Sequence, residues 1–256
     1  MKRGANHRTR CRAALSPRRA RRRPRRPAKP KHMFSATPIS SDGGSCSLVL
    51  PPWHLAPSLA SQLILEAFGP SRRSSDLPRA ERMVLDAQHD ALSSEEELPC
   101  APSTYGTLPT DMFSDPAFWD PALTADAQVL DIGAGDGQLI ATAVLVHGAF
   151  SAVGIEMAGA RVADGCAALE RLATALSGLR AASAPHWPLS AAAIEQPQQS
   201  SNPPRTIELR VGDARTAPFG RATSHVLLYA TCFPLALAQA LQRRLAAELP
   251  VGARVL

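Results

Sequence analysis

A glycine-rich turn between two apolar segments constrains the fold of this chain more than any other feature of its sequence. The turn lies in Val129–Gln138, which reads VLDIGAGDGQ. An apolar strand pattern at Ala127–Ile132 comes before it, and a helical pattern at Gln138–His147 follows it. Its three glycines let the backbone turn sharply and approach a ligand closely. The segment therefore predicts a strand–turn–helix unit that holds a ligand at the N-terminus of its helix.

The rest of residues 101–256 continues this alternation of strands and helices. Further strands are predicted at Phe150–Glu156, Ile207–Val211, Ser224–Ala230 and Ala253–Leu256, and further helices at Ala158–Leu179 and Pro234–Leu249. Residues 181–204 are predicted to form a long loop. Such alternation gives a mainly parallel sheet with helices on both faces, so the predicted fold class is α/β, Rossmann-like and doubly wound.

Three acidic residues follow three of the predicted strands at the same end. Asp131 closes the first strand, Glu156 ends the second, and Asp213 follows the third. Parallel strands end at one edge of a sheet, so these carboxylates are expected to surround one crevice. Glu156 is suited to accept both hydroxyls of a ribose, and Asp213 to accept from an adenine amino group. Each acid taken alone could equally cap the helix or turn that follows it.

The spacing of the glycines distinguishes two classes of cofactor. A dinucleotide fingerprint needs G-x-G-x-x-G, whereas this loop reads G-x-G-x-G and follows an acid, Asp131. Asp131 and Asp136 would repel a pyrophosphate, but they suit a cationic ligand that carries adenosine. S-adenosylmethionine has a sulfonium, a free amine and one ribose. It fits this pattern better than a nicotinamide dinucleotide, which is a minor alternative.

The order of these motifs resembles that of class I methyltransferases, which use S-adenosylmethionine. Within that superfamily, residues 104–256 resemble the Dot-one family, the histone-lysine methyltransferases that lack a SET domain. The resemblance is carried by Tyr105–Gly106, the glycine loop, Val153–Glu156, Val211–Ala214, Phe233 and Gly252–Leu256. It implies a twisted seven-stranded sheet with helices on both sides.

The resemblance also implies which residues hold the cofactor. A loop folding over it would consist of Tyr105, Gly106, Thr107 and Leu108. The methionine portion would lie against Asp131, Gly133, Ala134, Gly135, Asp136, Gly137 and Gln138. Glu156 would bind the ribose, and Asp213 with Ala214 would bind the adenine.

The sequence departs from the family pattern in three places. Residues 105–108 read Tyr-Gly-Thr-Leu where the family has Tyr-Gly-Glu-Thr, and no asparagine follows the fourth strand. The sequence also stops at the fifth of the seven strands that the family implies. The interpretation is therefore a class I core truncated after strand five.

The acceptor side of the crevice is expected after the fourth strand. Methyl transfer is an in-line displacement that needs donor and acceptor held close and aligned rather than a dedicated base. Tyr229, Thr231 and Phe233 are predicted to line the channel of a lysine acceptor, with plain packing as the alternative. A tight, largely apolar channel favours the neutral lysine that the reaction requires. No metal site is predicted.

The charges of the chain are unevenly distributed. Residues 1–32 hold 14 of the 28 lysines and arginines and no acid, so the other 224 residues carry a net charge of −8. This basic head is too polar and too strongly charged to fold alone. It is read as a nuclear-import signal or a nonspecific DNA-binding arm, as an Arg-rich organellar transit peptide, or as a solvated tail.

The remaining features concern the N-terminal part and the environment of the chain. Residues 1–56 are interpreted as the basic head and a Ser-, Gly- and Pro-rich linker, residues 57–100 as a helical extension, and residues 101–256 as the core. Within the extension, helices are predicted at Leu59–Phe68 and Leu77–Leu92. No apolar run is long enough to span a membrane. The five cysteines are widely spaced, which predicts neither a disulfide framework nor a zinc site and favours a reducing compartment.

These patterns together predict an S-adenosylmethionine-dependent protein-lysine N-methyltransferase. The resemblance implies the core of histone H-three as its substrate, a nucleosome as its partner and the nucleus as its location. One alternative is a methyltransferase of the same fold that acts on a non-histone protein, an RNA or a small molecule. The other is a degenerate cofactor-binding domain without catalytic activity.

Overall fold

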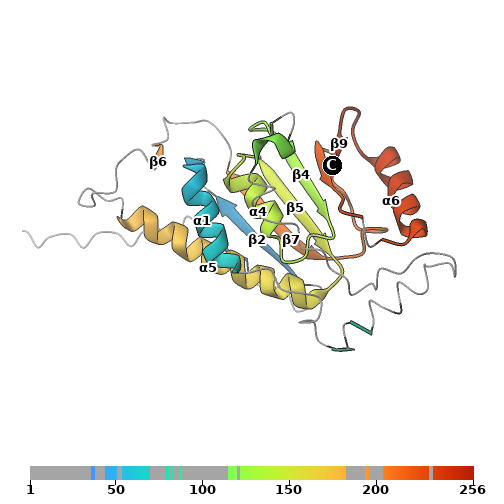
Figure 1. The fold of residues 1–256 in the computed structure, drawn as a ribbon, viewed down its shortest axis with the longest axis horizontal. Helices are drawn as coiled ribbons and strands as arrows, with labels where there is room; N and C mark the ends of the chain where they lie inside the picture. The colour runs from blue at the N-terminus through green and yellow to red at the C-terminus, as the bar shows by residue number, and fades with distance from the viewer. Residues whose placement is uncertain are drawn as a thin grey trace, which may run out of the picture. The chain divides into compact units, whose positions relative to one another are not determined.

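The computed structural model has a mixed α/β fold in which helices cover both faces of one mostly parallel sheet (Figure 1). It describes residues 36–37, 44–50, 54–69, 79–80, 82–83, 87, 115–119, 122–182, 194–195, 204–230 and 233–256. The basic head, residues 105–108 and Thr231 lie outside these ranges. The predicted α/β class is confirmed, and the arrangement is compatible with a Rossmann-like fold.

The order of strands across the sheet differs from their order along the chain. Across the sheet lie β1 (Ala36–Thr37), β2 (Ser45–Leu50), β7 (Arg205–Val211), β5 (Ser151–Glu156), β4 (Gln128–Ile132), β8 (His225–Leu227) and β9 (Arg254–Val255). The strands from β7 to β9 are parallel, whereas β1 and β2 pair antiparallel at one edge. A separate antiparallel pair joins β3 (His54–Leu55) to β6 (Ile194–Glu195).

The burial of each strand explains its sequence pattern. β4 lies between two parallel neighbours, and its last four residues are all buried, as expected for a continuous apolar run. β7 instead alternates buried with partly exposed residues along its first half, as expected for a strand with one covered face. The strands predicted from the turn to the end of the chain are therefore confirmed, although β8 and β9 are shorter than predicted, with three and two residues.

The helices are divided between the two faces of the sheet. α1 (Pro57–Phe68), α4 (Gln138–Leu145) and α5 (Gly159–Ala182) pack into one hydrophobic cluster. α6 (Leu235–Glu248) contributes Leu241 and Leu245 to a second cluster on the other face, away from the three helices in Figure 1. A short 3-10 turn, Pro116–Trp119, precedes β4. Within the described part of the chain, none of the helices combines the length and apolarity needed to cross a bilayer.

Helix α1 belongs to the core of the sheet domain. It begins with a proline at its first position, where the missing N–H costs no helical hydrogen bond. Its buried residues are Ala60, Leu63, Ile64 and Ala67, which share one helical face. This face packs against α4 and α5. The helix predicted at Leu59–Phe68 is therefore confirmed, whereas most of the second predicted helix, Leu77–Leu92, lies outside the described residues.

The interpretation of residues 33–56 as a linker is wrong for Ser45–Leu50. These residues form β2, which pairs antiparallel with β7 from Ser45–Arg210 to Leu50–Arg205. Its alternate residues Cys46, Leu48 and Leu50 are buried in the main core. The alternation of SCSLVL with a period of two therefore indicated a strand, although its serines had favoured the interpretation as a linker.

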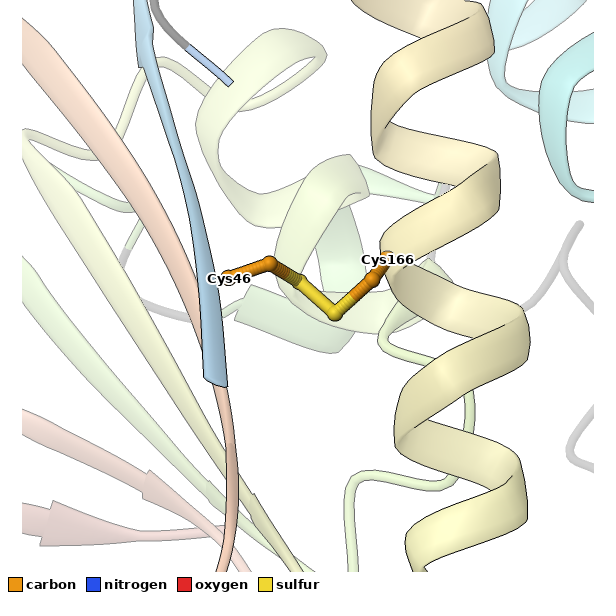
Figure 2. Close-up of a disulfide and its surroundings, with 2 residues drawn as sticks. All are labelled: Cys46 and Cys166. Atoms are coloured by element: carbon orange, nitrogen blue, oxygen red, sulfur yellow. A yellow bond between two sulfur atoms is a disulfide. The ribbon is translucent and has the colours of Figure 1, made fainter. Parts of the chain in front are cut away.

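The expectation that the cysteines form no disulfide is also wrong. Cys46 of β2 is bonded to Cys166 of α5, with an S–S distance of 2.08 Å and a Cα–Cα distance of 5.7 Å (Figure 2). Both residues are buried in the main core. The two cysteines are 120 residues apart, so their pairing depends on the way the fold brings β2 beside α5. The bond therefore links β2, the second strand from this edge of the sheet, to the helical layer.

Candidate functional site

The glycine loop between β4 and α4 forms the centre of the candidate site. Gly133, Gly135 and Gly137 have φ angles of 84°, 59° and 81°, in the left-handed region that other residues rarely adopt. Gly137 is also the N-cap residue of α4. Each glycine of the loop is thus required by the backbone, and the loop leads directly into the helix N-terminus as the sequence predicted.

The loop is attached to the end of the neighbouring strand β5. The amides of Gly133 and Ala134 donate to the carbonyl of Ile155, over 2.9 and 3.2 Å. The amide of Gly135 donates to Oε2 of Glu156 over 2.8 Å, and the amide of Ala158 donates to Oε1 over the same distance. Glu156 therefore joins the glycine loop to the start of α5, and each of its oxygens keeps a further acceptor site.

Two further glycines allow the loop to lie close to its neighbours. A Cβ atom on Gly154 of β5 would be 2.6 Å from the Cβ of Ala134. A Cβ atom on Gly165 of α5 would overlap the carbonyl oxygen of Asp136 and lie 2.5 Å from Leu209 Cδ2. Gly165 stands in an alanine-rich helical pattern, and nothing in that pattern indicated its contact with the loop. Close packing of strand, loop and helix thus depends on these two positions.

A Gly165→Ala substitution is expected to destabilise the protein by about 1–3 kcal/mol, because the backbone carbonyl of Asp136 has to move away from the new methyl group. Gly178→Ala in the same helix is the matched control, since nothing lies within 4 Å of its Cβ position. The control is expected to stabilise the protein by about 0.5–1 kcal/mol through helix propensity. Urea unfolding measures both changes, and a stabilising Gly165→Ala would contradict the close approach.

The carboxylates next to the loop create a strongly acidic environment. Asp131 is only 5% exposed, and burial together with the charges of Glu156 and Asp136 raises its pKa to about 8. Burial also raises the pKa of Asp136, although its carboxylate accepts from the amide of Gln138 over 3.2 Å. Ionisation of Asp131 is therefore unfavourable here, and a cationic group placed beside it would favour the ionised form.

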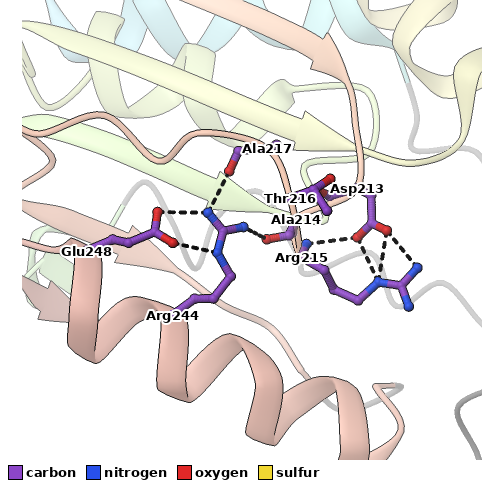
Figure 3. A network of polar contacts seen from close by, with 7 residues as sticks. All are labelled: Asp213, Ala214, Arg215, Thr216, Ala217, Arg244 and Glu248. Carbon is purple, nitrogen blue, oxygen red and sulfur yellow. Dashed lines mark hydrogen bonds and ion pairs between the residues drawn. The ribbon is translucent and has the colours of Figure 1, made fainter.

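Asp213 lies at the end of the third parallel strand, next to this acidic group. The amide of the preceding Gly212 donates to the carbonyl of Glu156 over 2.9 Å. The Asp213 carboxylate accepts from Arg215, whose Nε lies 2.8 Å from Oδ2 and whose backbone amide lies 2.8 Å from Oδ1 (Figure 3). Burial opposes ionisation of Asp213, but the Arg215 contacts and the charge of Arg244 lower its pKa overall. Asp213 is thus an ionised acceptor with a basic partner.

The other predicted residues fall into two groups. Phe233 lies against the loop, because a Cβ atom on Gly133 would be 3.5 Å from Cζ of its ring. Tyr229 follows β8 and is 49% exposed. Ala214 lies in the turn after Asp213, and its carbonyl accepts from Arg244. Thr231 and the predicted cofactor loop, Tyr105 to Leu108, lie outside the described residues.

Two arginines that act on Asp213 were not predicted from the sequence. Arg215 is two residues from the acid, a spacing that could have indicated a local ion pair. Arg244 is on α6 and comes near only through the fold. Among the residues that the structure describes, no group of three or more histidine, cysteine or acidic side chains is arranged to hold a metal ion.

Comparison with known proteins adds no family to this description. No protein-family model matches the chain, and no curated protein matches it. The functional interpretation therefore depends on the acids at the strand ends and on the glycine loop described above.

Proposed function

We propose that the chain is an S-adenosylmethionine-dependent methyltransferase. The observation that carries the proposal is the set of three acids, Asp131, Glu156 and Asp213, at the ends of three neighbouring parallel strands around a left-handed glycine loop. Ligands of open α/β sheets bind at this edge, outside the carboxyl ends of the strands. The acids at this edge would repel a pyrophosphate, whereas a cationic ligand would favour their ionised forms.

The residues fit the three parts of this cofactor. The buried Asp131, whose charged neighbours are acids, would bind the cationic amine of the methionine portion. Glu156 would bind the ribose hydroxyls through the acceptor sites that its two amide partners leave. Asp213 and Ala214 would bind the adenine, and the adenine amino group would replace one of the hydrogen bonds from Arg215.

The proposed acceptor is the side chain of a protein lysine, as the resemblance to the Dot-one family implies. The bound cofactor would supply a methyl group that passes to a neutral amine as its bond to sulfur breaks, leaving a thioether and releasing a proton to solvent. Phe233 beside the glycine loop gives this part of the site an apolar wall, which disfavours a charged amine. Tyr229 and Thr231 would line the same channel.

The proposed substrate is a core histone within a nucleosome, with the nucleus as the place of action. Nuclear thiols are kept reduced, so Cys46 and Cys166 would be unbonded there and would form the disulfide on oxidation. The basic head supports this choice, because its 14 positive charges would bind DNA phosphates without sequence preference. The rest of the chain is acidic and would gain little affinity for DNA by itself. The head would therefore position the enzyme on chromatin and take no part in the chemistry.

Cofactor binding to the wild type and a Glu156→Gln variant tests the first part of the proposal. S-adenosylmethionine is expected to raise the melting temperature of the wild type. Glu156→Gln loses the charge and keeps only one acceptor oxygen for the two amides of Gly135 and Ala158, so its affinity is expected to fall about 10- to 100-fold. Glu170→Gln, at an exposed position of α5, is the matched control and is expected to bind like the wild type. An unchanged wild-type melting curve at millimolar cofactor would contradict the proposal.

Transfer of a labelled methyl group tests the substrate. Nucleosomes, free histones and total RNA are each incubated with the protein and labelled cofactor, and label on a histone lysine is expected. Label in RNA alone would exclude the histone and leave the methyltransferase. Binding without transfer to any of the three would favour a degenerate cofactor-binding domain.

A further inference from the structure

We propose that Arg244 is a positioning residue that fixes the Asp213 turn and thereby sets the selectivity of the site for a 6-amino purine over a 6-oxo purine. Arg244 lies on α6, on the face of the sheet opposite the helix that follows the glycine loop. The inference rests on the proposed function, because it assumes that Asp213 faces the base of an adenosine ligand.

The guanidinium of Arg244 holds both ends of the turn that follows Asp213 (Figure 3). Its Nη1 donates to the carbonyl of Ala214 over 2.5 Å, and its Nη2 donates to the carbonyl of Ala217 over 3.0 Å. The amides of Thr216 and Ala217 donate in turn to the carbonyl of Asp213, over 2.9 and 2.8 Å. The turn is therefore closed by its own hydrogen bonds, and Arg244 joins it to α6 by two more, beside the apolar contacts of Ala214 and Ala217 with the second cluster.

One peptide group connects Arg244 to the Asp213 carboxylate. The peptide between Ala214 and Arg215 carries the carbonyl that Arg244 holds and the N–H that donates to Asp213 Oδ1 over 2.8 Å. A trans peptide is planar, and its carbonyl and N–H point in opposite directions. The direction of the carbonyl therefore fixes the direction of the N–H. Rotation of this peptide away from Arg244 would remove the hydrogen bond that orients the carboxylate.

Arg244 is itself held from two further sides. Its Nε and Nη2 each lie 2.7 Å from an oxygen of Glu248, one helical turn later. Its guanidinium carbon lies 4.0 Å from the centre of the Phe219 ring. Only a planar group with several donors in a fixed fork can make all these contacts together, so a lysine cannot replace it. The side chain is thus rigid enough to define the position of the turn.

The selectivity follows from the chemistry of the carboxylate. An ionised carboxylate only accepts hydrogen bonds, so it can pair with the amino group of adenine and repels the carbonyl oxygen of hypoxanthine. Such discrimination requires the carboxylate to be held in place, since a mobile one could turn away from the wrong base. The charge of Arg244 also favours the ionised form of Asp213.

Binding of two ligands to three proteins tests this inference. The ligands are S-adenosylhomocysteine and S-inosylhomocysteine, and the proteins are the wild type, Arg244→Gln and the control Arg243→Gln. Arg243 is the exposed neighbour of Arg244 on the same helix. The wild type and the control are expected to prefer the adenine ligand at least about tenfold. Arg244→Gln is expected to reduce this preference below about threefold, mainly by weakening the adenine ligand.

Hydrogen exchange of the ligand-free proteins tests the positioning without any ligand. Arg244→Gln is expected to speed exchange of the amides of Arg215 to Ala217 and to leave the amide of Gly135 unchanged. Arg244→Lys, which keeps the charge, is expected to give the same pattern and the same loss of selectivity, and it serves if Arg244→Gln does not fold. Exchange that rises equally at both places would overturn the positioning role.

The outcomes separate the inference from the function on which it rests. If the wild type binds neither ligand, the proposed function fails and this inference fails with it. Should the wild type bind both ligands equally, or should Arg244→Gln weaken both to the same extent, the inference alone is overturned. Loss of selectivity in both Arg244 variants, with the Arg243 control unchanged, supports it.

Discussion

Replacing Cys46 and Cys166 with alanine is expected to lower the free energy of unfolding by about 5 kcal/mol, the largest stability change that the structure predicts. The disulfide closes a loop across a sequence separation of 120 residues, and the chain-entropy account of crosslinks gives this magnitude for a loop of that length. For a domain of this size, the change corresponds to a fall in melting temperature of about 10–20 °C.

Thermal unfolding with and without a reducing agent measures this effect. The oxidised wild type is expected to melt highest, and reduction is expected to bring it close to the double alanine variant. Reductant should not change the variant itself, which provides the internal control. A wild type whose melting temperature is the same under both conditions, and equal to that of the variant, would show that the bond between β2 and α5 does not form.

The second large effect is the dependence of cofactor affinity on pH. Asp131 has a pKa raised to about 8 by burial and by Glu156 and Asp136, so its carboxyl group is mostly protonated at pH 6. A cationic amine needs the ionised form, and the proton must therefore leave on binding. The dissociation constant of S-adenosylmethionine is expected to fall about 20-fold from pH 6 to pH 8 and to rise again above that, because the methionine amine, with a pKa of about 8, then loses its own proton.

Asp131→Asn and a truncated ligand provide the controls for this prediction. The asparagine variant is expected to bind weakly at every pH, because it cannot ionise. Methylthioadenosine lacks the methionine amine, so its affinity is expected to change little over the same range. A pH dependence that is equally steep for both ligands would exclude an interaction of Asp131 with the amine.

The same titration acts on stability in the opposite direction. Since the folded pKa of Asp131 is raised, the folded state keeps its proton between about pH 4 and 8 while the unfolded chain loses it. The contribution of this group to stability is therefore greatest below pH 4 and falls as the pH rises to about 8. Asp131→Asn imitates the protonated form, so it is expected to be more stable than the wild type at pH 8 while binding cofactor less well.

The parts of the fold that depend on neighbouring residues could be predicted from the sequence. The strand β4, the left-handed loop and α4 follow one another directly, and the apolar pattern and three glycines indicate each of them. The acids at the strand ends could be predicted for the same reason, because each directly follows a recognisable strand. Such features depend on interactions within a few residues.

The parts that depend on distant residues could not be predicted in this way. β2 is a strand because β7 lies beside it, and Cys46 meets Cys166 for the same reason. Arg244 meets Ala214 only after α6 has packed on the second face of the sheet. Gly165 is required by the Asp136 carbonyl, which comes from another element. In each case the partner is set by the topology of the sheet, which a single sequence does not record.

The position of β2 along the chain also has a consequence for synthesis on the ribosome. Its partner β7 is separated from it by residues 51–204, so at usual rates of elongation the side of β2 that pairs with β7 stays unpaired for about 8–30 s, while its other side faces the earlier strand β1. When β7 appears, β2 is already available to cover its edge. The free edge of β7 is therefore exposed to other chains only briefly. The strand that stays unpaired with β7 during synthesis is the short and serine-rich β2.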